Sequence, residues 1–470
     1  MAPPPPPPPP PRTKPGDYHY HVYDWEGATA PWELSPAQPD PPNYRFYSMV
    51  RDLDGLREYG AWKGIPNIAL TAIGAPTSGG RKTMALSFGN KDRLKGQPTV
   101  LITGGIHARE WAATEMAYLL AEYLLVNYSA QPPVTKYQRA IRDLIDTRAI
   151  HIIPMVNPDG NWHTVFGADA VDQPARQWRK NRRPLPAVPV DWIDELTGIS
   201  GPNEPFLDVR GPDADESDAR YKVPDYDPDR GIPPNLPPPE QYRDRKLESG
   251  QTGVDLNRNF STAAWGFDCA FAYKNYNPAA STYFGNKAGG EVETANVQGL
   301  VESLNGFATT IDYHTYGQFI LYPEEAVNSK MVSPDYTRMG ETLNSLIKSQ
   351  DGQGYTLGTG MALIQIEANG TTADYLAQRK QARAFTIELD PGYYTVNPDG
   401  AGFLLPETKV MALFETNIRG ALAAIAGAPR KLDTVGVVWR KEVFSATAIQ
   451  FLPWDVYGRG NRLPVNDLPA

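Results

Sequence analysis

PTVLITGGIHAREW, residues 98–111, changes character abruptly at its middle. Its first half is a continuous apolar run of the kind that forms a buried strand. Its second half brings a histidine, an arginine and a glutamate together directly after two glycines. In α/β sheets, ligands bind where the loops that leave the strand ends meet. The stretch therefore predicts a core strand that ends at a functional site.

The surrounding sequence alternates short β-rich runs with helical patterns, which indicates an α/β fold with a largely parallel or mixed central sheet. An amphipathic helix is expected around residues 113–124, because Ala113, Met116, Ala117, Leu120 and Leu124 recur at helical spacing. Further helices are expected around residues 297–304 and 406–427. The expected strands cover residues 68–74, 82–88, 98–104, 148–156, 307–314 and 319–323.

The composition excludes several classes of protein. A chain of 470 residues with 41% hydrophobic residues can bury a large core. Its net charge of −9 offers no basic surface for phosphates, so nucleic acid is not an expected partner. No apolar run is long enough to span a membrane, and no secretory signal pattern opens the chain. With Cys269 as its single cysteine, the protein is expected in the cytoplasm, or exported without a standard signal peptide.

Three proline-rich or peripheral segments flank or interrupt the α/β pattern. Residues 1–43 form an expected N-terminal arm that opens with unbroken proline from Pro3 to Pro11, either a stiff tail or a docking site for a partner. Residues 183–240 are acidic and rich in proline, as expected of an insertion in a domain spanning residues 44–427. Residues 428–470 form an expected β-rich extension.

His107 and Glu110 are spaced so that one turn can direct both side chains at a single ion, and imidazole plus carboxylate is a usual ligand set for catalytic zinc. A lone His-x-x-Glu also arises as a surface pair, so a third ligand is needed. His314 ends the expected strand 307–314 and is the best candidate. His21 is expected to pack on the surface, and His151 to be a core histidine.

Six motifs in order resemble the zinc metallocarboxypeptidases of the carboxypeptidase A/B type. They are GIHAREW at 105–111, NPDG at 157–160, WRKNR at 178–182, GVDLNRNF at 253–260, DYHTYGQFILYP at 312–323 and FTIEL at 385–389. The resemblance runs from about Tyr44 to Gly427. It implies a mixed central β-sheet flanked by helices, one zinc ion per chain, and a peptide substrate with a free C-terminal carboxylate.

The resemblance also implies a role for each matching residue. His107, Glu110 and His314 would hold zinc, and Glu388 would act as general base and proton shuttle. Arg182 would stabilise the oxyanion, and Asn257 with Arg258 would grip the terminal carboxylate of the substrate. Arg109, Arg179 and Tyr316 would line the outer groove.

These roles agree with the chemistry of the residue types. A metal ion can polarise the peptide carbonyl and activate a water molecule, from which Glu388 would take a proton. A guanidinium such as that of Arg182 stabilises charge that develops in the transition state. The planar fork of Arg258 can bind a free carboxylate through two parallel hydrogen bonds, which an internal peptide bond cannot match. The reaction expected is therefore removal of one C-terminal amino acid.

The sequence departs from the family pattern at the substrate lid and in the specificity pocket. Where relatives carry a lid tyrosine, this chain has Gln365 or Ile366. Ala373 stands at the base of the expected pocket, where basic-specific relatives carry aspartate, and this favours a neutral or apolar terminal residue. Glu325 and Asp374 are close enough in sequence to alter that preference.

Two other functions compete with the exopeptidase. The same scaffold could serve an amidase or deacylase that acts on cell-wall peptides or N-acyl amino acids. A non-catalytic binding module could instead use the groove or the polyproline arm, although binding alone does not require Glu388.

Overall fold

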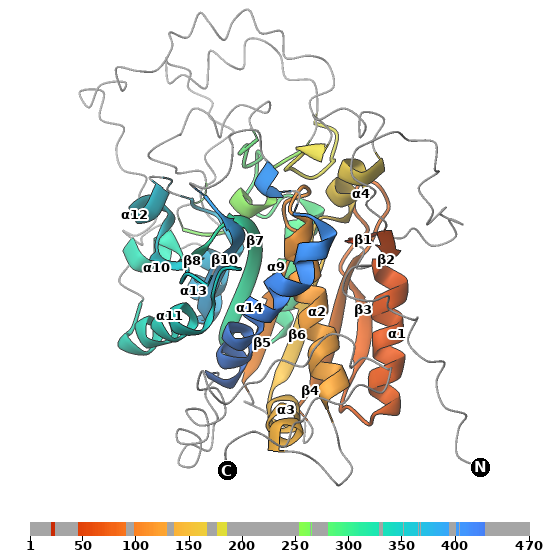
Figure 1. Cartoon of the computed structure of the whole chain (residues 1–470). Helices are drawn as coiled ribbons and strands as arrows, with labels where there is room; N and C mark the ends of the chain where they lie inside the picture. Colours follow the sequence, from red (N-terminus) through yellow and green to blue (C-terminus); the bar gives the residue numbers. More distant parts are fainter. Residues whose placement is uncertain are drawn as a thin grey trace, which may run out of the picture.

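The computed structural model describes most of the segment between the expected arm and the expected extension (Figure 1). The insertion is described only at residues 183–185, and the 428–470 extension lies outside the described residues, as does the arm apart from a short segment. The structure describes residues 20–23, 46–90, 98–128, 136–166, 176–185, 253–263, 265, 281–328, 332–350, 352–364, 366, 368–393, 401–403 and 405–427.

An eight-stranded mixed sheet forms the centre of the molecule, in the order β3-β4-β6-β5-β7-β10-β8-β9. The central strands β6, β5, β7 and β10 are parallel, and β3, β4 and β8 introduce antiparallel pairs. The strand bounds are β3 Ala69–Ile73, β4 Thr83–Gly89, β5 Thr99–Thr103, β6 Ala149–Ile153, β7 Phe307–Gly317, β8 Phe319–Leu321, β9 Thr356–Gly358 and β10 Arg383–Gly392. The predicted fold class is confirmed.

Helices cover both faces of this sheet (Figure 1). One core contains side chains of α1 Met49–Trp62, α2 Trp111–Asn127, α3 Lys136–Asp146, α11 Pro334–Leu346 and α14 Glu407–Gly427. The other contains side chains of α9 Val292–Ser303 and α13 Thr372–Lys380. Shorter helices α4 Pro158–Phe166, α10 Glu324–Asn328 and α12 Gly360–Ile364 lie in the connections. Two cores explain why β5 is buried along its whole length.

Helix α2 differs from its prediction. The spacing of apolar residues predicts an amphipathic helix, but nearly every residue of α2 is buried, including Glu115 and Glu122. Contacts with the sheet, with α1 and α3, and with α14 surround it. A helix that is covered on all sides does not need a polar face, so periodicity alone underestimates its burial.

A segment of the expected arm belongs to the packed core. Strand β1, Tyr20–Val22, pairs in parallel with β2, Phe46–Ser48, and its side chains are fully buried. The prediction that His21 packs on the surface is wrong, because its Nδ1 lies 2.6 Å from Glu115 Oε2 and its Nε2 lies 3.2 Å from Asp52 Oδ2. A boundary at residue 44 therefore divides segments that pack together.

Among the helices that the structure describes, none is both long and apolar enough to cross a bilayer.

Candidate active site

Two glycines turn the chain from the end of β5 into the site. A Cβ atom on Gly104 would lie 2.4 Å from the carbonyl oxygen of Ala113, and one on Gly105 would lie 2.3 Å from Thr114 Oγ1. Gly105 also has a φ of +60°, a left-handed backbone conformation that residues with a side chain rarely adopt. The loop can therefore fold back against the first turn of α2, which sets His107 and Glu110 side by side.

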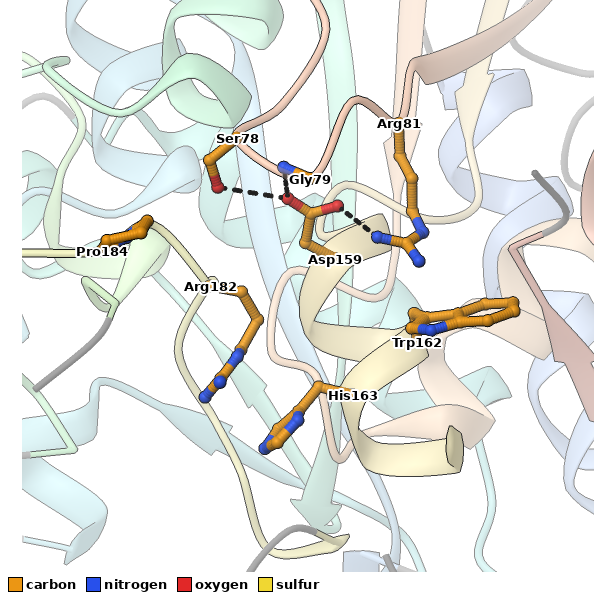
Figure 2. Close-up of a pocket in the computed structure, with 8 residues that line it drawn as sticks. All are labelled: Ser78, Gly79, Arg81, Asp159, Trp162, His163, Arg182 and Pro184. Carbon is orange, nitrogen blue, oxygen red and sulfur yellow. Dashed lines mark hydrogen bonds and ion pairs between the residues drawn. The ribbon is translucent and has the colours of Figure 1, made fainter. Parts of the chain in front are cut away.

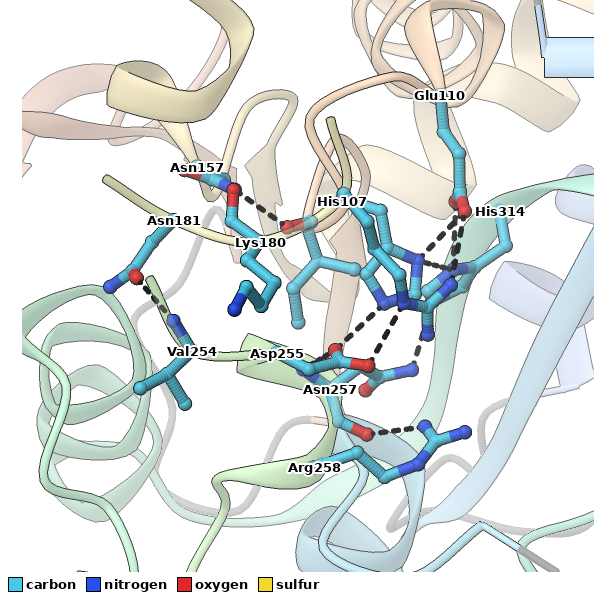
Figure 3. A network of polar contacts seen from close by, with 12 residues as sticks. His107, Glu110, Asn157, Lys180, Asn181, Val254, Asp255, Asn257, Arg258 and His314 are labelled. Carbon is cyan, nitrogen blue, oxygen red and sulfur yellow. Dashed lines mark hydrogen bonds and ion pairs between the residues drawn. The ribbon is translucent and has the colours of Figure 1, made fainter. Parts of the chain in front are cut away.

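The three predicted metal ligands converge at one point (Figure 3). His107 Nδ1 lies 2.8 Å from Glu110 Oε1, and His314 Nδ1 lies 3.0 Å from Glu110 Oε2. The two Nδ1 atoms are 3.1 Å apart, and all three side chains are buried. Their ligand atoms lie within 4.8 Å of one another. Two imidazoles and one carboxylate are a donor set that fits catalytic zinc, with a coordination position left for water.

Two aspartates hold the histidines from behind. His107 Nε2 lies 3.1 Å from Asp255 Oδ1, and His314 Nε2 lies 3.0 Å from Asp312 Oδ2. Such outer partners fix the ring orientation, so that the Nδ1 atoms of both rings would hold a metal ion. Asp255 and Asp312 both lie within the quoted motifs, but the motifs alone did not predict this role.

The electrostatics of the cluster favour a cation. Burial raises the pKa of Glu110, but the nearby His107 and His314 outweigh burial and hold this pKa well below its usual range. Burial lowers the pKa of His314, but the carboxylates of Asp312 and Glu110 reverse this, and the net pKa is raised well above its usual value. The shift of His314 shows that the buried carboxylates favour a positive charge, and the shift of Glu110 shows that its carboxylate stays ionised beside the histidines.

Glu388 lies beside this cluster through strand register. On the parallel strands β10 and β7, Glu388 pairs with His314, so the two side chains leave the same face of the sheet. Burial raises the pKa of Glu388 to about 7, and the charges of His314 and Glu110 also act on it. The carboxyl group is thus poised to change its protonation state near neutral pH.

The predicted carboxylate clamp borders the metal ligands. Asn257 and Arg258 lie in the short helix η4, Leu256–Arg258, whose N-cap is Asp255. Asn257 Nδ2 lies 3.2 Å from His314 Nε2, and its Oδ1 accepts a hydrogen bond from Thr372 N at 3.0 Å. Arg258 Nη1 donates to the carbonyl oxygen of Asn257 at 2.8 Å.

The arginines of the WRKNR motif lie in different surroundings. Arg179 Nε donates to Asp255 Oδ2 at 2.9 Å, and its Nη1 lies 3.8 Å from Glu110 Oε1. The guanidinium that contacts a metal ligand is thus that of Arg179, which the resemblance assigns to the outer groove. Arg182, which the resemblance assigns to the oxyanion, stacks on Trp178 with its guanidinium carbon 4.6 Å from the ring centre.

Two residues predicted for the outer groove meet at Phe403. The guanidinium carbon of Arg109 lies 3.8 Å from the Phe403 ring centre, and the Tyr316 ring lies 4.8 Å from it. Arg109 Nη1 also donates to the carbonyl oxygen of Gln177 at 3.1 Å. These contacts form a cationic and aromatic wall next to Thr315, whose N–H donates to Glu110.

The specificity residues are resolved in part. Ala373 is buried in α13, within the core that also contains Leu256 and Phe260. Glu325 and Asp374 are both buried nearby, and Glu325 N donates to Asp374 Oδ1 at 3.1 Å. Gly370 N donates to Glu325 Oε1 at 3.2 Å, which brings this carboxylate to the same turn. Gln365 lies outside the described residues.

Comparisons with known proteins identify one family. The family model for zinc carboxypeptidase matches residues 62–419. Carboxypeptidase A4 of Mus musculus is 23% identical over 325 residues, which cover 68% of this chain and 56% of the relative. Carboxypeptidase B of Bos taurus is 24% identical over 387 residues, which cover 79% of this chain and 68% of the relative.

A solved structure shows the same fold. Carboxypeptidase A from Helicoverpa armigera superposes with a TM-score of 0.51 at 23% identity, covering 80% of this chain and 73% of that one. The chain spans little more than half the length of the mouse relative. Since the family model matches well over half of the residues, this chain belongs to the zinc carboxypeptidase family.

Proposed function

We propose that the protein is a zinc-dependent exopeptidase that hydrolyses the C-terminal peptide bond of peptides and releases one amino acid. The observation that carries this proposal is the in-register pairing of Glu388 with His314, beside the convergent His107 and Glu110. This arrangement supplies a metal site and a carboxyl base at one point, which a binding module does not require.

When bound, the zinc ion supplies Lewis acidity, which polarises the scissile carbonyl and lowers the pKa of a water molecule. Glu388 would take a proton from that water and deliver it to the leaving nitrogen. Burial raises the pKa of Glu388, which favours a carboxyl group that can accept a proton and return it. Asp255 and Asp312 keep the histidine rings in place during the reaction.

The clamp gives the reaction its direction. Arg258 and Asn257 would bind the free carboxylate of the substrate, next to His314, so that the last peptide bond reaches the site. We infer that Arg179, which lies beside Glu110 and Asp255, would stabilise the oxyanion in place of Arg182, to which the sequence assigned that role. A neutral or apolar terminal residue is expected at Ala373, while the buried Glu325 and Asp374 favour testing lysine and arginine as well.

The test is mass spectrometry of a peptide library after digestion. We expect successive loss of single C-terminal residues, and Glu388→Gln should lower kcat by about 10²- to 10⁴-fold. Zinc content, measured by elemental analysis, should stay at one ion per chain in this variant. Internal cleavage, or a ladder that persists with Glu388→Gln, contradicts the proposal.

The alternatives predict other products. An amidase or deacylase would act on cell-wall peptides or N-acyl amino acids, and N-blocked dipeptides assayed beside these substrates distinguish the reactions. A binding module would hold zinc but would show no turnover, either before or after the zinc is removed by a chelator. A partner for the polyproline arm is a separate proposal, tested by deleting residues 1–16 and measuring turnover.

A further inference from the structure

A hydroxyl group lies behind one of the two aspartates that orient the metal-ligand histidines. Thr103, the last residue of β5, donates a hydrogen bond from Oγ1 to Asp312 Oδ1 at 2.6 Å. The other oxygen of this carboxylate, Asp312 Oδ2, lies 3.0 Å from His314 Nε2. All three side chains are buried. They therefore form a chain of two polar contacts that begins at a threonine and ends at a metal ligand.

Strand pairing brings this chain together. Thr103 and Asp312 are partners in the register of the parallel strands β5 and β7, so their side chains leave the same face of the sheet. Two residues further along β7, His314 leaves that face as well and pairs with Glu388 of β10. The threonine, the aspartate, the metal ligand and the expected base are thus all placed by the centre of the sheet, and their arrangement does not depend on a loop.

The other metal-ligand histidine is held by a different arrangement. His107 Nε2 lies 3.1 Å from Asp255 Oδ1. The carboxylate of Asp255 also accepts hydrogen bonds from Arg179 Nε at 2.9 Å and from Asn257 N at 3.0 Å. A guanidinium and a backbone N–H therefore fix this aspartate, and the guanidinium balances its charge.

A buried aspartate outside the metal site is paired with arginine in the same way. Figure 2 shows Asp159, whose Oδ1 accepts a hydrogen bond from Arg81 Nη1 at 2.9 Å. Asp312 differs from both of these aspartates. In the part of the chain that the structure describes, its side chain meets His314 and Thr103 and no guanidinium. The negative charge of Asp312 is therefore directed at His314, and the donor that fixes the carboxylate is a hydroxyl group.

The hydroxyl group is needed because a carboxylate can rotate about its bond to Cβ. The hydrogen bond to Oδ1 fixes the plane of the Asp312 carboxylate, so that Oδ2 is held against the ring of His314. Without Thr103 Oγ1, Oδ1 would be a buried acceptor that has lost its donor, which is unfavourable. Another donor is close, because Asn257 Nδ2 lies 3.2 Å from His314 Nε2. A carboxylate that turns toward this amide would release the ring.

We propose that Thr103 is a positioning residue of the zinc site, which fixes the carboxylate of Asp312 and, through it, the ring of His314. Zinc affinity then depends on a hydroxyl group that acts through a second residue. The inference goes beyond the proposed exopeptidase, because it concerns how a metal ligand is held and not which bond is cut.

The test compares two threonines of β5 that make matched hydrogen bonds. Thr99 Oγ1 donates to the carbonyl oxygen of Asn305 at 2.6 Å, the same distance as in the bond from Thr103 to Asp312, and both threonines are buried. Thr103→Val and Thr99→Val each remove one hydroxyl group and keep a β-branched side chain. Chelator competition should show zinc affinity about five- to tenfold lower in Thr103→Val, less than direct loss of an outer partner can cost. Thr99→Val should keep the wild-type affinity.

Further variants show whether the hydroxyl group acts through Asp312. Thr103→Ser keeps the oxygen and should restore most of the zinc affinity. In an Asp312→Ala protein, adding Thr103→Val should change zinc affinity by less than about twofold, because the residue that transmits the effect is already gone. With cobalt(II) in place of zinc, the visible absorption spectrum reports the geometry of the ligands. This spectrum should change in Thr103→Val and stay as in wild type in Thr99→Val.

The outcomes separate this inference from the proposed function. Wild-type zinc affinity in Thr103→Val, or an effect of Thr103→Val that persists in full in the Asp312→Ala protein, overturns the positioning role. Equal zinc loss in the two valine variants also overturns it, because the cause would then be the packing of β5. If zinc affinity follows the expected pattern in a protein that releases no amino acid from any peptide, the exopeptidase is wrong and the positioning role stands.

Discussion

Helix α2 lies between two buried clusters of histidine and carboxylate groups that use the same residue types for different ends. At its N-terminus, Glu110 meets His107 and His314. In its second turn, Glu115 meets His21, which also contacts Asp52. The first cluster joins strand ends at the sheet edge, and the second joins the N-terminal segment to the core.

The difference lies in how many rings share one carboxylate. In the metal-ligand cluster, aspartates hold both Nε2 atoms, and the two Nδ1 atoms face the single carboxylate of Glu110. In the His21 cluster, a single ring lies between two carboxylates. Burial lowers the pKa of His21, but Glu115 and Asp52 outweigh burial and raise it to about 9. The His21 cluster supplies a single imidazole, whereas the metal-ligand cluster brings two ring nitrogens and one carboxylate together.

The largest expected effect is on zinc affinity, when one histidine of each cluster is replaced by alanine. His314→Ala removes one of three zinc ligands, and zinc affinity should fall by well over the roughly 100-fold that loss of an outer partner can cost. His21→Ala should keep the wild-type affinity. Chelator competition measures both, and equal zinc loss in the two variants would remove the distinction between the clusters.

The pH dependence of the free energy of unfolding tests the His21 cluster. The pKa of His21 is raised from 6.5 in the unfolded chain to about 9, so its stabilisation is fully present below pH 6.5 and is lost as pH rises through 9. The shift corresponds to about 3 kcal/mol in the free energy of unfolding.

Urea unfolding of the zinc-loaded protein between pH 6 and 10 measures how the free energy of unfolding depends on pH. This range brackets both pKa values of His21. His21→Gln should be less stable at pH 6.5 and should lose this part of the pH dependence. Superimposable curves for the two proteins would show that His21 is not protonated in the folded state.

The sequence predicted the metal-ligand cluster of His107, Glu110 and His314 better than the His21 cluster, for a physical reason. His107 and Glu110 share one turn, and His314 lies near the end of β7, so local patterns and ordered motifs identify them. His21 depends on Glu115, 94 positions away, and on Asp52 in another helix, and no local pattern encodes such contacts. Proline and aromatic residues around His21 also favoured an exposed arm.

The fold shows the same limit. The six strands expected from apolar runs all form, and so do the helices expected around residues 113–124, 297–304 and 406–427. The burial of α2 on all sides depends on which helices pack around it, which periodicity does not reveal. The sequence also did not predict where the side chains of Arg179 and Arg182 point. The segment between them is not a regular strand, so side-chain alternation does not assign them to a face.

The smallest expected effect tests whether residues 20–23 belong to the core. Tyr20 donates its hydroxyl to the carbonyl oxygen of Leu405, and its ring meets the edge of Trp111. Tyr20→Phe keeps the ring and leaves a buried carbonyl without this donor, which should cost about 1–2 kcal/mol in the free energy of unfolding. Trp62→Phe, at an exposed position of α1, should stay within about 0.5 kcal/mol of wild type.

Because Trp111 directly follows the zinc ligand Glu110, zinc affinity of Tyr20→Phe is measured as well. An unchanged affinity with reduced stability assigns the segment to packing, whereas unchanged stability would return it to the arm.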